Sequence, residues 1–538
     1  MHGVKDNALT RGGLPPGFER GQELHLEVNP LREERLRRQE SAEVIVPAEI
    51  RGKKSGEGPN AEEEEPLPAC RGRRDGCKAP VKYRRLPRGG SGESRKEAGR
   101  VRSVHIARKT SSISGGKTME DLLEAMLRPE NLTEAWKNVR RNNGAPGIDG
   151  VRVEDYPVHV RAKWPDIVCQ LREGTYRPAP VKRVVIPKPD GGERQLGIPT
   201  VQDRHIQQAL LQILTPLFEA RFSDASYGFR PGRSAHQAVE AARNHIAAGY
   251  EWVADIDLEK YFDRVNHDIL MSRVRRVVKD LRIVRLVRSY LNAGVMENGV
   301  CVRSDEGTPQ GGPLSPLLAN ILLDDLDKAL EQRGHRFVRY ADDCNIYVKS
   351  PRSGERVMAG VRDYLEKKLK LKVNEKKSAV ARPKDRKFLG FSFMKRKGQI
   401  LVRIAPRSIE RFKENVRRYT RRNWSIDLDR RLHVLNRYLR GWLGYYRKID
   451  TPSILQELDE WIRRRLRTCV LKRWKTPKNI WRNLVAQGVT RKEAAKLAGS
   501  RKGWWRRSRT PQMNKALGLA WWAERGLMSL STVYQASR

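Results

Sequence analysis

The sequence predicts an α+β protein of several domains, in which short antiparallel hairpins lie among helices and a basic, helical region follows. Three observations support this. At 538 residues the chain exceeds what one hydrophobic core usually holds. Between residues 119 and 400, short β-branched runs bounded by turn residues alternate with amphipathic stretches of helical period. Beyond Leu401, apolar residues recur every three or four positions among arginines, which is typical of basic amphipathic helices.

Helices are expected first. Met119 opens an apolar pattern of helical spacing, and a second helix over 130–141 is ended by the turn residues 142–147. Further helices are predicted over 206–218 and 317–330.

Strands are expected between these helices. The β-branched run 181–186 turns at Pro187 to Gly192 and returns over 195–198 as a hairpin. A strand is predicted over 252–256, and a second hairpin pairs 337–340 with 345–348.

The chain divides into four regions by composition. Residues 1–117 are rich in Gly, Pro, Arg and Glu and contain hardly an aromatic, so they are expected to be a disordered extension. This extension is either a basic nucleic-acid tail or sequence upstream of a true start at Met119. Residues 118–400 carry the α+β pattern, 401–473 the basic helices, and 474–538 a short region rich in Arg and Trp.

The charge indicates a polyanionic partner. Lys and Arg number 108 against 64 acidic residues, giving a net charge of +44, which nucleic acid would offset. The sequence contains no apolar run of membrane-spanning length and no apolar core of a signal peptide, so we expect a cytoplasmic protein bound to its nucleic acid and no membrane partner. The six cysteines lack paired close spacings, which argues against disulfides and zinc modules.

Adjacent carboxylates occur at the tip of the second hairpin. Asp342 and Asp343 would repel one another there unless a cation held them, and Asp257 follows the strand 252–256, at a strand end where sites are commonly built. An acidic pair alone is weak evidence, because Asp324-Asp325 also occurs in this chain.

Three blocks make the pattern specific. The tetrad 340–343 (Tyr-Ala-Asp-Asp), the block 257–263 and the segment 307–316 (Gly-Thr-Pro-Gln-Gly-Gly-Pro-Leu-Ser-Pro) together resemble the reverse transcriptases encoded by bacterial group II introns. Their order and separation also match, over about residues 119–530. The resemblance implies a right-hand polymerase with fingers and an antiparallel palm sheet, then an α-helical thumb or maturase domain and a small basic C-terminal region.

The resemblance also implies the catalytic residues. Asp257, Asp342 and Asp343 become the ligands of two Mg²⁺ ions, with Mn²⁺ as the ion that could substitute. Asp255 is a rival for the first position, but the family places an aromatic five residues after the catalytic acid, which selects Asp257 with Phe262. In similar enzymes that aromatic excludes a 2′-hydroxyl, so dNTPs are the expected substrates.

Further residues are implied around the nucleotide and the nucleic acid. The predicted dNTP-binding residues are Lys188, Arg194, Phe262, Gln310 and Lys377. Segments 227–234 (template path), 388–391 (primer grip), 436–446 (thumb) and 500–507 (DNA contact) supply the predicted nucleic-acid-binding residues, which are Tyr227, Arg230, Arg233, Phe388, Gly390, Arg437, Arg440, Arg463, Arg464, Arg501, Lys502, Trp504 and Arg506. For the tryptophans of the C-terminal region, packing of a small core is the alternative interpretation; these residues are Trp504, Trp505, Trp521 and Trp522.

The implied function is an RNA-directed DNA polymerase and maturase that binds its group II intron RNA, promotes splicing and copies the RNA into DNA at a target primer during retrohoming. Its partners would be intron RNA, an RNA template/DNA primer duplex, target DNA and dNTPs. The C-terminal region resembles the lineage that lacks an endonuclease, since no His-Asn-His module with paired cysteines follows. Two alternatives remain open at this point, a domesticated reverse transcriptase in defence or repair and a non-catalytic splicing cofactor. Sequence does not give the oligomeric state.

Overall fold

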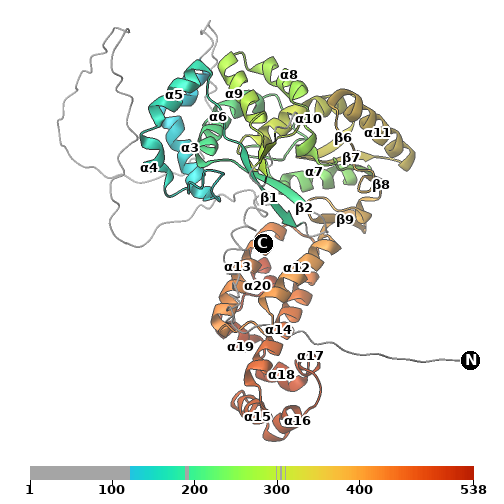
Figure 1. The fold of residues 1–538 in the computed structure, drawn as a ribbon. Helices are drawn as coiled ribbons and strands as arrows, with labels where there is room; N and C mark the ends of the chain where they lie inside the picture. Colours follow the sequence, from blue (N-terminus) through green and yellow to red (C-terminus); the bar gives the residue numbers. More distant parts are fainter. Residues whose placement is uncertain (1–120, 188–192, 298–299, 303–305, 309–310, 538) are drawn as a thin grey trace, which may run out of the picture. The chain divides into compact units, whose positions relative to one another are not determined.

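A computed structural model describes residues 121–187, 193–297, 300–302, 306–308 and 311–537 (Figure 1). The interpretation of residues 1–117 as a disordered extension therefore lies outside the described residues. In the described ranges, no helix combines the length and the apolarity needed to cross a bilayer.

The first region combines helices with a four-stranded sheet of order β2-β1-β4-β5. Its strands are β1 (Val181–Pro187), β2 (Glu193–Ile198), β4 (Val295–Glu297) and β5 (Val300–Val302). β1 and β2 pair antiparallel, as the sequence predicts, while β1 and β4 pair parallel. The helices of this region are α2 (Leu122–Leu127), α3 (Pro129–Asn142), α4 (Tyr156–Arg161), α5 (Trp164–Glu173), α6 (Val201–Glu219), α8 (His267–Val277) and α9 (Leu281–Leu291).

Helix α6 organises this region. Thr200 caps it by accepting a hydrogen bond from the Asp203 amide, which satisfies a donor that the first helical turn leaves unpaired. Its buried residues include Leu210 and Leu214, and the helix packs along α3. The predicted helices over 130–141 and 206–218 are thus confirmed.

A second four-stranded sheet, of order β6-β7-β3-β8, is antiparallel throughout. Its strands are β3 (Trp252–Ile256), β6 (Arg336–Tyr340), β7 (Asp343–Val348) and β8 (Ala379–Ala381). Helices α7 (Ala235–Ala247), α10 (Ser315–Gln332) and α11 (Pro351–Tyr364) pack against it, α7 on β6 and α11 on β3 and β7. Short turns of 3₁₀ or π type are η1 (Tyr261–Arg264), η2 (Leu365–Leu369) and η3 (Pro383–Asp385).

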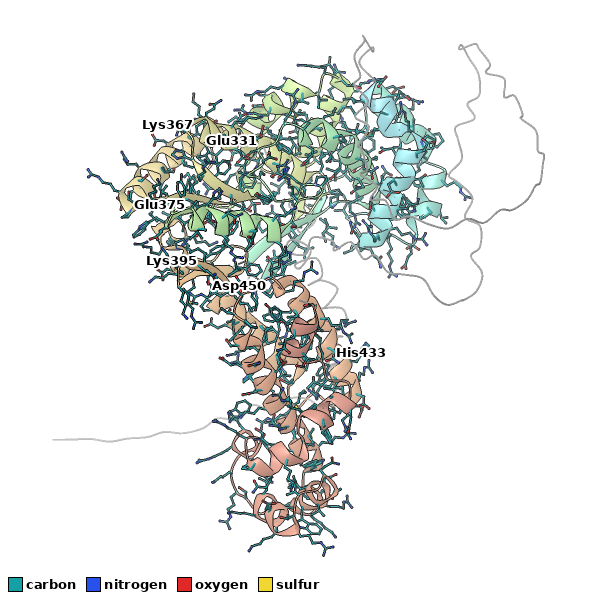
Figure 2. All side chains as sticks on the ribbon, turned by 180° about the vertical axis from the view of Figure 1, so that it is seen from behind. Glu331, Lys367, Glu375, Lys395, His433 and Asp450 are labelled. Atoms are coloured by element: carbon teal, nitrogen blue, oxygen red, sulfur yellow. The ribbon has the colours of Figure 1, made fainter. Side chains whose placement is uncertain are left out.

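The chain beyond this sheet forms the hairpin β9 (Phe391–Arg396) and β10 (Gln399–Ile404) and is then helical. Three helices follow, α12 (Pro406–Tyr419), α13 (Leu428–Tyr446) and α14 (Ser453–Trp474). Asp450, labelled in Figure 2, joins the end of α13 to β10, because its backbone amide donates to the Val402 carbonyl and its carboxylate accepts from the Val402 amide, at 2.8 and 2.9 Å.

Six short helices complete the described chain: α15 (Pro477–Ala486), α16 (Arg491–Ala498), α17 (Trp504–Arg507), α18 (Pro511–Ala516), α19 (Leu519–Glu524) and α20 (Leu530–Ala536). They share one hydrophobic cluster with α12, α13, α14 and the β9–β10 hairpin. Trp522 is fully buried in that cluster, so core packing, the alternative interpretation of the Trp-rich segment, holds for this residue.

Candidate active site

The tetrad 340–343 forms the turn between β6 and β7. Tyr340 pairs with Asp343, and Ala341 has a positive φ of 58°, a left-handed conformation that reverses the chain within two residues. On the neighbouring strand, Ile256 pairs with Cys344. Asp257, one residue beyond the end of β3, therefore lies at the same end of the sheet as Asp343, which is the convergence that the sequence predicts.

Asp343 is surrounded by other acidic groups at this end of the sheet. Burial raises the pKa of Asp343 well above its usual value, and the charges of Asp255, Asp342 and Asp257 raise it further, while Lys387 lowers it. Each effect has the expected sign, because burial and neighbouring anions disfavour an ionised carboxylate and a nearby cation favours it.

Asp255 and Asp257 have different partners. The Arg386 Nε donates to Asp255 Oδ2 at 2.8 Å, so the first acid is engaged in an ion pair. Asp257 also has an ion-pair partner, Lys377 Nζ at 3.6 Å, but its side chain is only half-buried and lies one residue past the strand end. This difference favours Asp257 over Asp255 as a metal ligand.

The donor set fits magnesium. The three acids offer only oxygen ligands, and Mg²⁺ needs a few carboxylates because it retains waters and uses substrate phosphates as well. Among the described residues, no three His, Cys, Asp or Glu side chains already close around a single point.

The predicted nucleotide residues are placed in part. Phe262 is half-buried in η1 beside Tyr261, and its carbonyl accepts a hydrogen bond from the Thr308 amide at 2.7 Å. The Gly307 amide likewise donates to Val265 O at 2.8 Å, so the segment that leads to position 310 is docked on the Phe262 turn. Lys188 and Gln310 lie outside the described residues, and although Arg194 lies in β2, its side chain does too.

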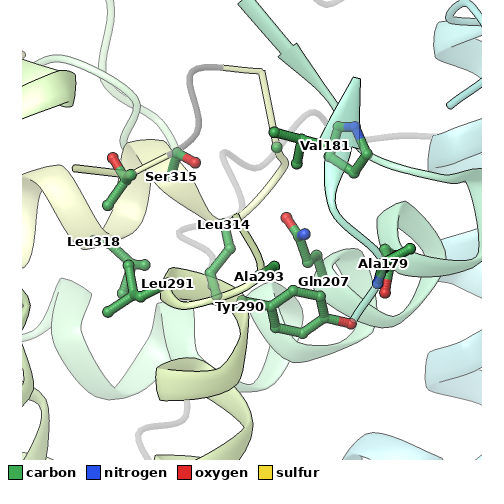
Figure 3. A pocket seen from close by; sticks show the side chains of 13 residues that line it. Ala179, Val181, Gln207, Tyr290, Leu291, Ala293, Leu314, Ser315 and Leu318 are labelled. Atoms are coloured by element: carbon green, nitrogen blue, oxygen red, sulfur yellow. Dashed lines mark hydrogen bonds between the residues drawn. The ribbon is translucent and has the colours of Figure 1, made fainter. Parts of the chain in front are cut away.

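A small cavity is lined in part by residues of the predicted nucleotide-binding segment 307–316, among them Leu314 and Ser315 (Figure 3). Its volume is about 20 Å³, and its walls come from β1, α6, α9 and the start of α10. Val181, Gln207, Tyr290 and Leu318 are among the lining residues labelled in Figure 3. Thr308, Gly312, Leu314 and Ser315, which line the cavity, thus pack against elements of the first region, and residues 307–308 also contact the Phe262 turn.

The segment 227–234 has a mixed role. Arg230 is buried, and its guanidinium donates to Glu219 and to the carbonyls of Ser223 and Ser226, so its position inside the fold contradicts a phosphate contact. Sequence could not separate the two roles, because an arginine in a motif looks the same whether buried or exposed. Tyr227 is half-buried, with the Arg233 guanidinium 5.6 Å from its ring centre.

The predicted primer-grip segment is a tight two-residue turn. Phe388 and Phe391 exchange backbone hydrogen bonds of 2.9 Å, and Leu389 and Gly390 between them have φ values of 49° and 82°. The Tyr445 hydroxyl on α13 donates to Leu389 O at 2.8 Å, which fastens the turn to the helical region. Phe388 is buried in the core, so any contact with a primer comes from the turn rather than from this ring.

The basic residues of the C-terminal helices differ in exposure. Arg437 and Arg440 on α13 are exposed, as are Arg501, Lys502 and Arg506 near α17. Arg463 and Arg464 are half-buried, and the Arg464 guanidinium lies 3.7 Å from the centre of the Trp505 ring. Trp504 is half-buried beside Arg507, whereas its neighbour Trp505 is exposed.

Two cations at the site are absent from the sequence-based prediction. Lys387 acts electrostatically on both Asp255 and Asp343, and Arg386 pairs with Asp255. Both residues directly precede the primer-grip turn. A buried cluster of acids needs positive charge nearby, and this requirement could have led us to look for cations close to the predicted site.

Comparison with known proteins agrees with this geometry. Residues 186–393 match the family described as reverse transcriptase (RNA-dependent DNA polymerase), and residues 409–487 match the maturase-specific domain of group II introns. Protein YkfC of Escherichia coli K12 is 34% identical over 329 residues, which cover 54% of this chain and 84% of YkfC. The chain belongs to the group II intron reverse transcriptase family.

Other members of this reverse transcriptase family match over shorter spans. The group II intron-encoded protein LtrA of Lactococcus lactis is 37% identical over 219 residues, 40% of this chain and 36% of LtrA, so the match spans about a third of that relative. A solved chain of a partial Cas6-RT-Cas1–Cas2 complex is 27% identical, with 46% of this chain and 43% of that chain covered and a TM-score of 0.31. A TM-score this low adds nothing to the family assignment.

Proposed function

We propose that this protein is an RNA-directed DNA polymerase that extends a DNA primer on intron RNA with dNTPs, and that it also binds the intron RNA as a maturase. The observation that carries the proposal is the meeting of Asp342 and Asp343, at the β6–β7 turn, with Asp257 at the end of β3. Three carboxylates at one sheet end suit two-metal phosphoryl transfer.

In this proposal Asp257, Asp342 and Asp343 hold two Mg²⁺ ions. When bound, these ions would activate the attacking 3′-hydroxyl and stabilise the negative charge of the leaving pyrophosphate. Phe262 borders the sugar and excludes a 2′-hydroxyl. Lys377 Nζ, 3.6 Å from Asp257, holds a proton close to the departing pyrophosphate.

RNA binding is proposed for the exposed faces of the helical region. The maturase-specific match covers most of α12 and all of α13, α14 and α15, and Arg437 and Arg440 on α13 are exposed cations. Arginines on helices suit phosphate contacts along an A-form duplex or folded RNA. By binding folded intron RNA, the protein stabilises it as any ligand stabilises the state that it prefers, and splicing remains the chemistry of the RNA. Target DNA is the proposed partner of the basic residues near α17.

Primer extension tests the polymerase proposal. The purified full chain is incubated with an RNA template, an annealed DNA primer, dNTPs and Mg²⁺, beside the variants Asp257→Asn and Asp363→Asn. Asp363 is an exposed acid on α11 that pairs with Lys367 and is not among the proposed site residues. We expect extension by the wild type and by Asp363→Asn, and none by Asp257→Asn. A wild type that binds intron RNA but incorporates no dNTP would instead identify a non-catalytic splicing cofactor.

A further inference from the structure

Arg339, three residues before Asp342, is almost completely buried. It is 1% exposed, and Asp327 of α10, which faces it, is 0% exposed. The pair is bidentate, since Nε donates to Asp327 Oδ1 at 2.7 Å and Nη2 donates to Oδ2. Moving two such charges out of water costs several kcal/mol per ion, and the pairing regains this only with good geometry and further hydrogen bonds.

The remaining edge of the guanidinium provides those bonds. Nη1 donates to Asn320 Oδ1 and to the carbonyl oxygen of Ala341, both at 2.9 Å. Asn320 in turn donates from Nδ2 to Gly228 O at 2.8 Å. A single buried arginine therefore links helix α10, the tetrad turn and the segment 227–234.

Ala341 is the residue that needs such support. An L-residue in the left-handed region costs roughly 1–2 kcal/mol, and Ala341 adopts it at φ 58° between Tyr340 and Asp342. Its carbonyl is held by Arg339, while its amide side is covered by Gly228, where a Cβ would overlap the Ala341 nitrogen. The two peptide groups that flank Ala341 are thus each held by a contact, one at its amide nitrogen and one at its carbonyl oxygen.

We propose that Arg339, held by Asp327 and Asn320, is a positioning residue that fixes the Ala341 turn so that Asp342 and Asp343 face the metal site with Asp257. The inference rests on the proposed polymerase function. It goes beyond that function because it proposes that a buried ion pair, which contacts neither metal nor substrate, sets the orientation of the two acids.

A lysine at position 339 tests this directly. Arg339→Lys keeps the charge but cannot bridge Asp327, Asn320 and the Ala341 carbonyl at once, because an ammonium lacks the planar fork of a guanidinium. The matched control is Arg431→Lys. Arg431 is also buried, and it donates to the carbonyls of Tyr419, Arg421 and Trp424 far along the chain from the tetrad.

Three quantities are measured for each protein: Mn²⁺ affinity by electron paramagnetic resonance without nucleotide, the Mg²⁺ concentration for half-maximal primer extension, and the melting temperature. Residues that orient metal ligands typically change metal affinity by about 10–100-fold when replaced. We expect Arg339→Lys to weaken Mn²⁺ binding and raise the Mg²⁺ requirement by about tenfold or more. Arg431→Lys lowers the melting temperature but leaves both metal readouts within about twofold of the wild type.

The second variant is Asn320→Ala, which removes one hydrogen-bond acceptor of Arg339 and leaves the ion pair with Asp327 in place. We expect it to weaken Mn²⁺ binding by a smaller factor than Arg339→Lys does. If Arg339→Lys does not fold, the Mn²⁺ affinity of Asn320→Ala tests the inference. Wild-type Mn²⁺ affinity in folded Arg339→Lys or Asn320→Ala, an equal loss in Arg431→Lys, or no Mn²⁺ binding by the wild type would each overturn the inference. A wild type that binds Mn²⁺ but extends no primer would remove the proposed function, and the Mn²⁺ comparison would still judge Arg339.

Discussion

Gly390 in the primer-grip turn and Gly398 in the β9–β10 turn form a natural matched pair. Both occupy the second position of a two-residue turn in which each residue has a positive φ, 49° and 82° at Leu389 and Gly390, and 48° and 77° at Lys397 and Gly398. They differ in surroundings. A Cβ at Gly390 would lie 2.5 Å from the Tyr446 hydroxyl oxygen, whereas a Cβ at Gly398 meets no atom within 4 Å.

Replacing each glycine by alanine distinguishes the cost of the left-handed backbone conformation, which both positions share, from the cost of the steric overlap with Tyr446, which only position 390 has. The left-handed conformation costs an L-residue about 1–2 kcal/mol at either position. At Gly390 the overlap with Tyr446 adds about 1–3 kcal/mol, because Tyr446 is itself buried and cannot move aside freely. Gly390→Ala should therefore lose about 2–5 kcal/mol and Gly398→Ala about 1–2 kcal/mol, a difference of several degrees at about 2–4 °C per kcal/mol.

The same pair tests the function of the turn. Since the Tyr445 hydroxyl fastens Leu389 to α13, displacement of Tyr446 should shift the turn and raise the KM for the primer duplex in Gly390→Ala only. Thermal melts and primer-extension kinetics with varied primer measure both effects. Equal melting temperatures and equal primer KM values for the two variants would refute the proposal that this turn contacts the primer and is held in position by α13.

Three further predictions follow from particular side chains. Phe262→Ala should raise ribonucleotide incorporation relative to dNTP by about tenfold or more, since excluding one hydroxyl is worth on the order of 1–3 kcal/mol, and an unchanged ratio would remove its sugar-gate role. Burial lowers the pKa of His205 to about 4, so neutral His205 contributes stability above its unfolded pKa near 6.5 that is lost as pH falls toward 4. The chain should lose about 2 kcal/mol between pH 7.5 and pH 5, an acid sensitivity that His205→Phe reduces and His159→Gln, at an exposed position, does not. The raised pKa of Asp343 means that its ionised form destabilises the metal-free chain as pH rises through that pKa. Asp343→Asn should therefore raise the melting temperature of the metal-free chain at pH 7.5, and a lower melting temperature would contradict the repulsion.

Periodicity and turn residues predicted most of the fold around the site. The strand 252–256 and the two predicted hairpins occur where β-branched runs meet turn residues, because this pattern reports local backbone preference and one buried face. The short pair β4 and β5 was not predicted, since three-residue strands carry too little pattern to distinguish from a loop.

The candidate site was predictable where motif and strand end coincide, as at Asp257 and the tetrad. Burial was not predictable for arginines. Arg230 pairs with Glu219, eleven residues earlier on α6, and Arg339 pairs with Asp327 on α10, so each partner is brought close only by tertiary packing. The positive charge of Arg230 within its motif therefore led to the prediction of a nucleic-acid contact. That prediction is wrong, because the structure has a buried ion pair at this position.

We propose that the acids at the β6–β7 turn catalyse DNA synthesis while the basic helices bind RNA. Asp342→Asn tests both parts in one variant, measured by primer extension on an RNA template and by intron RNA binding at the same salt concentration. We expect loss of extension with unchanged RNA affinity and unchanged salt dependence. Extension at the wild-type rate by Asp342→Asn would contradict it.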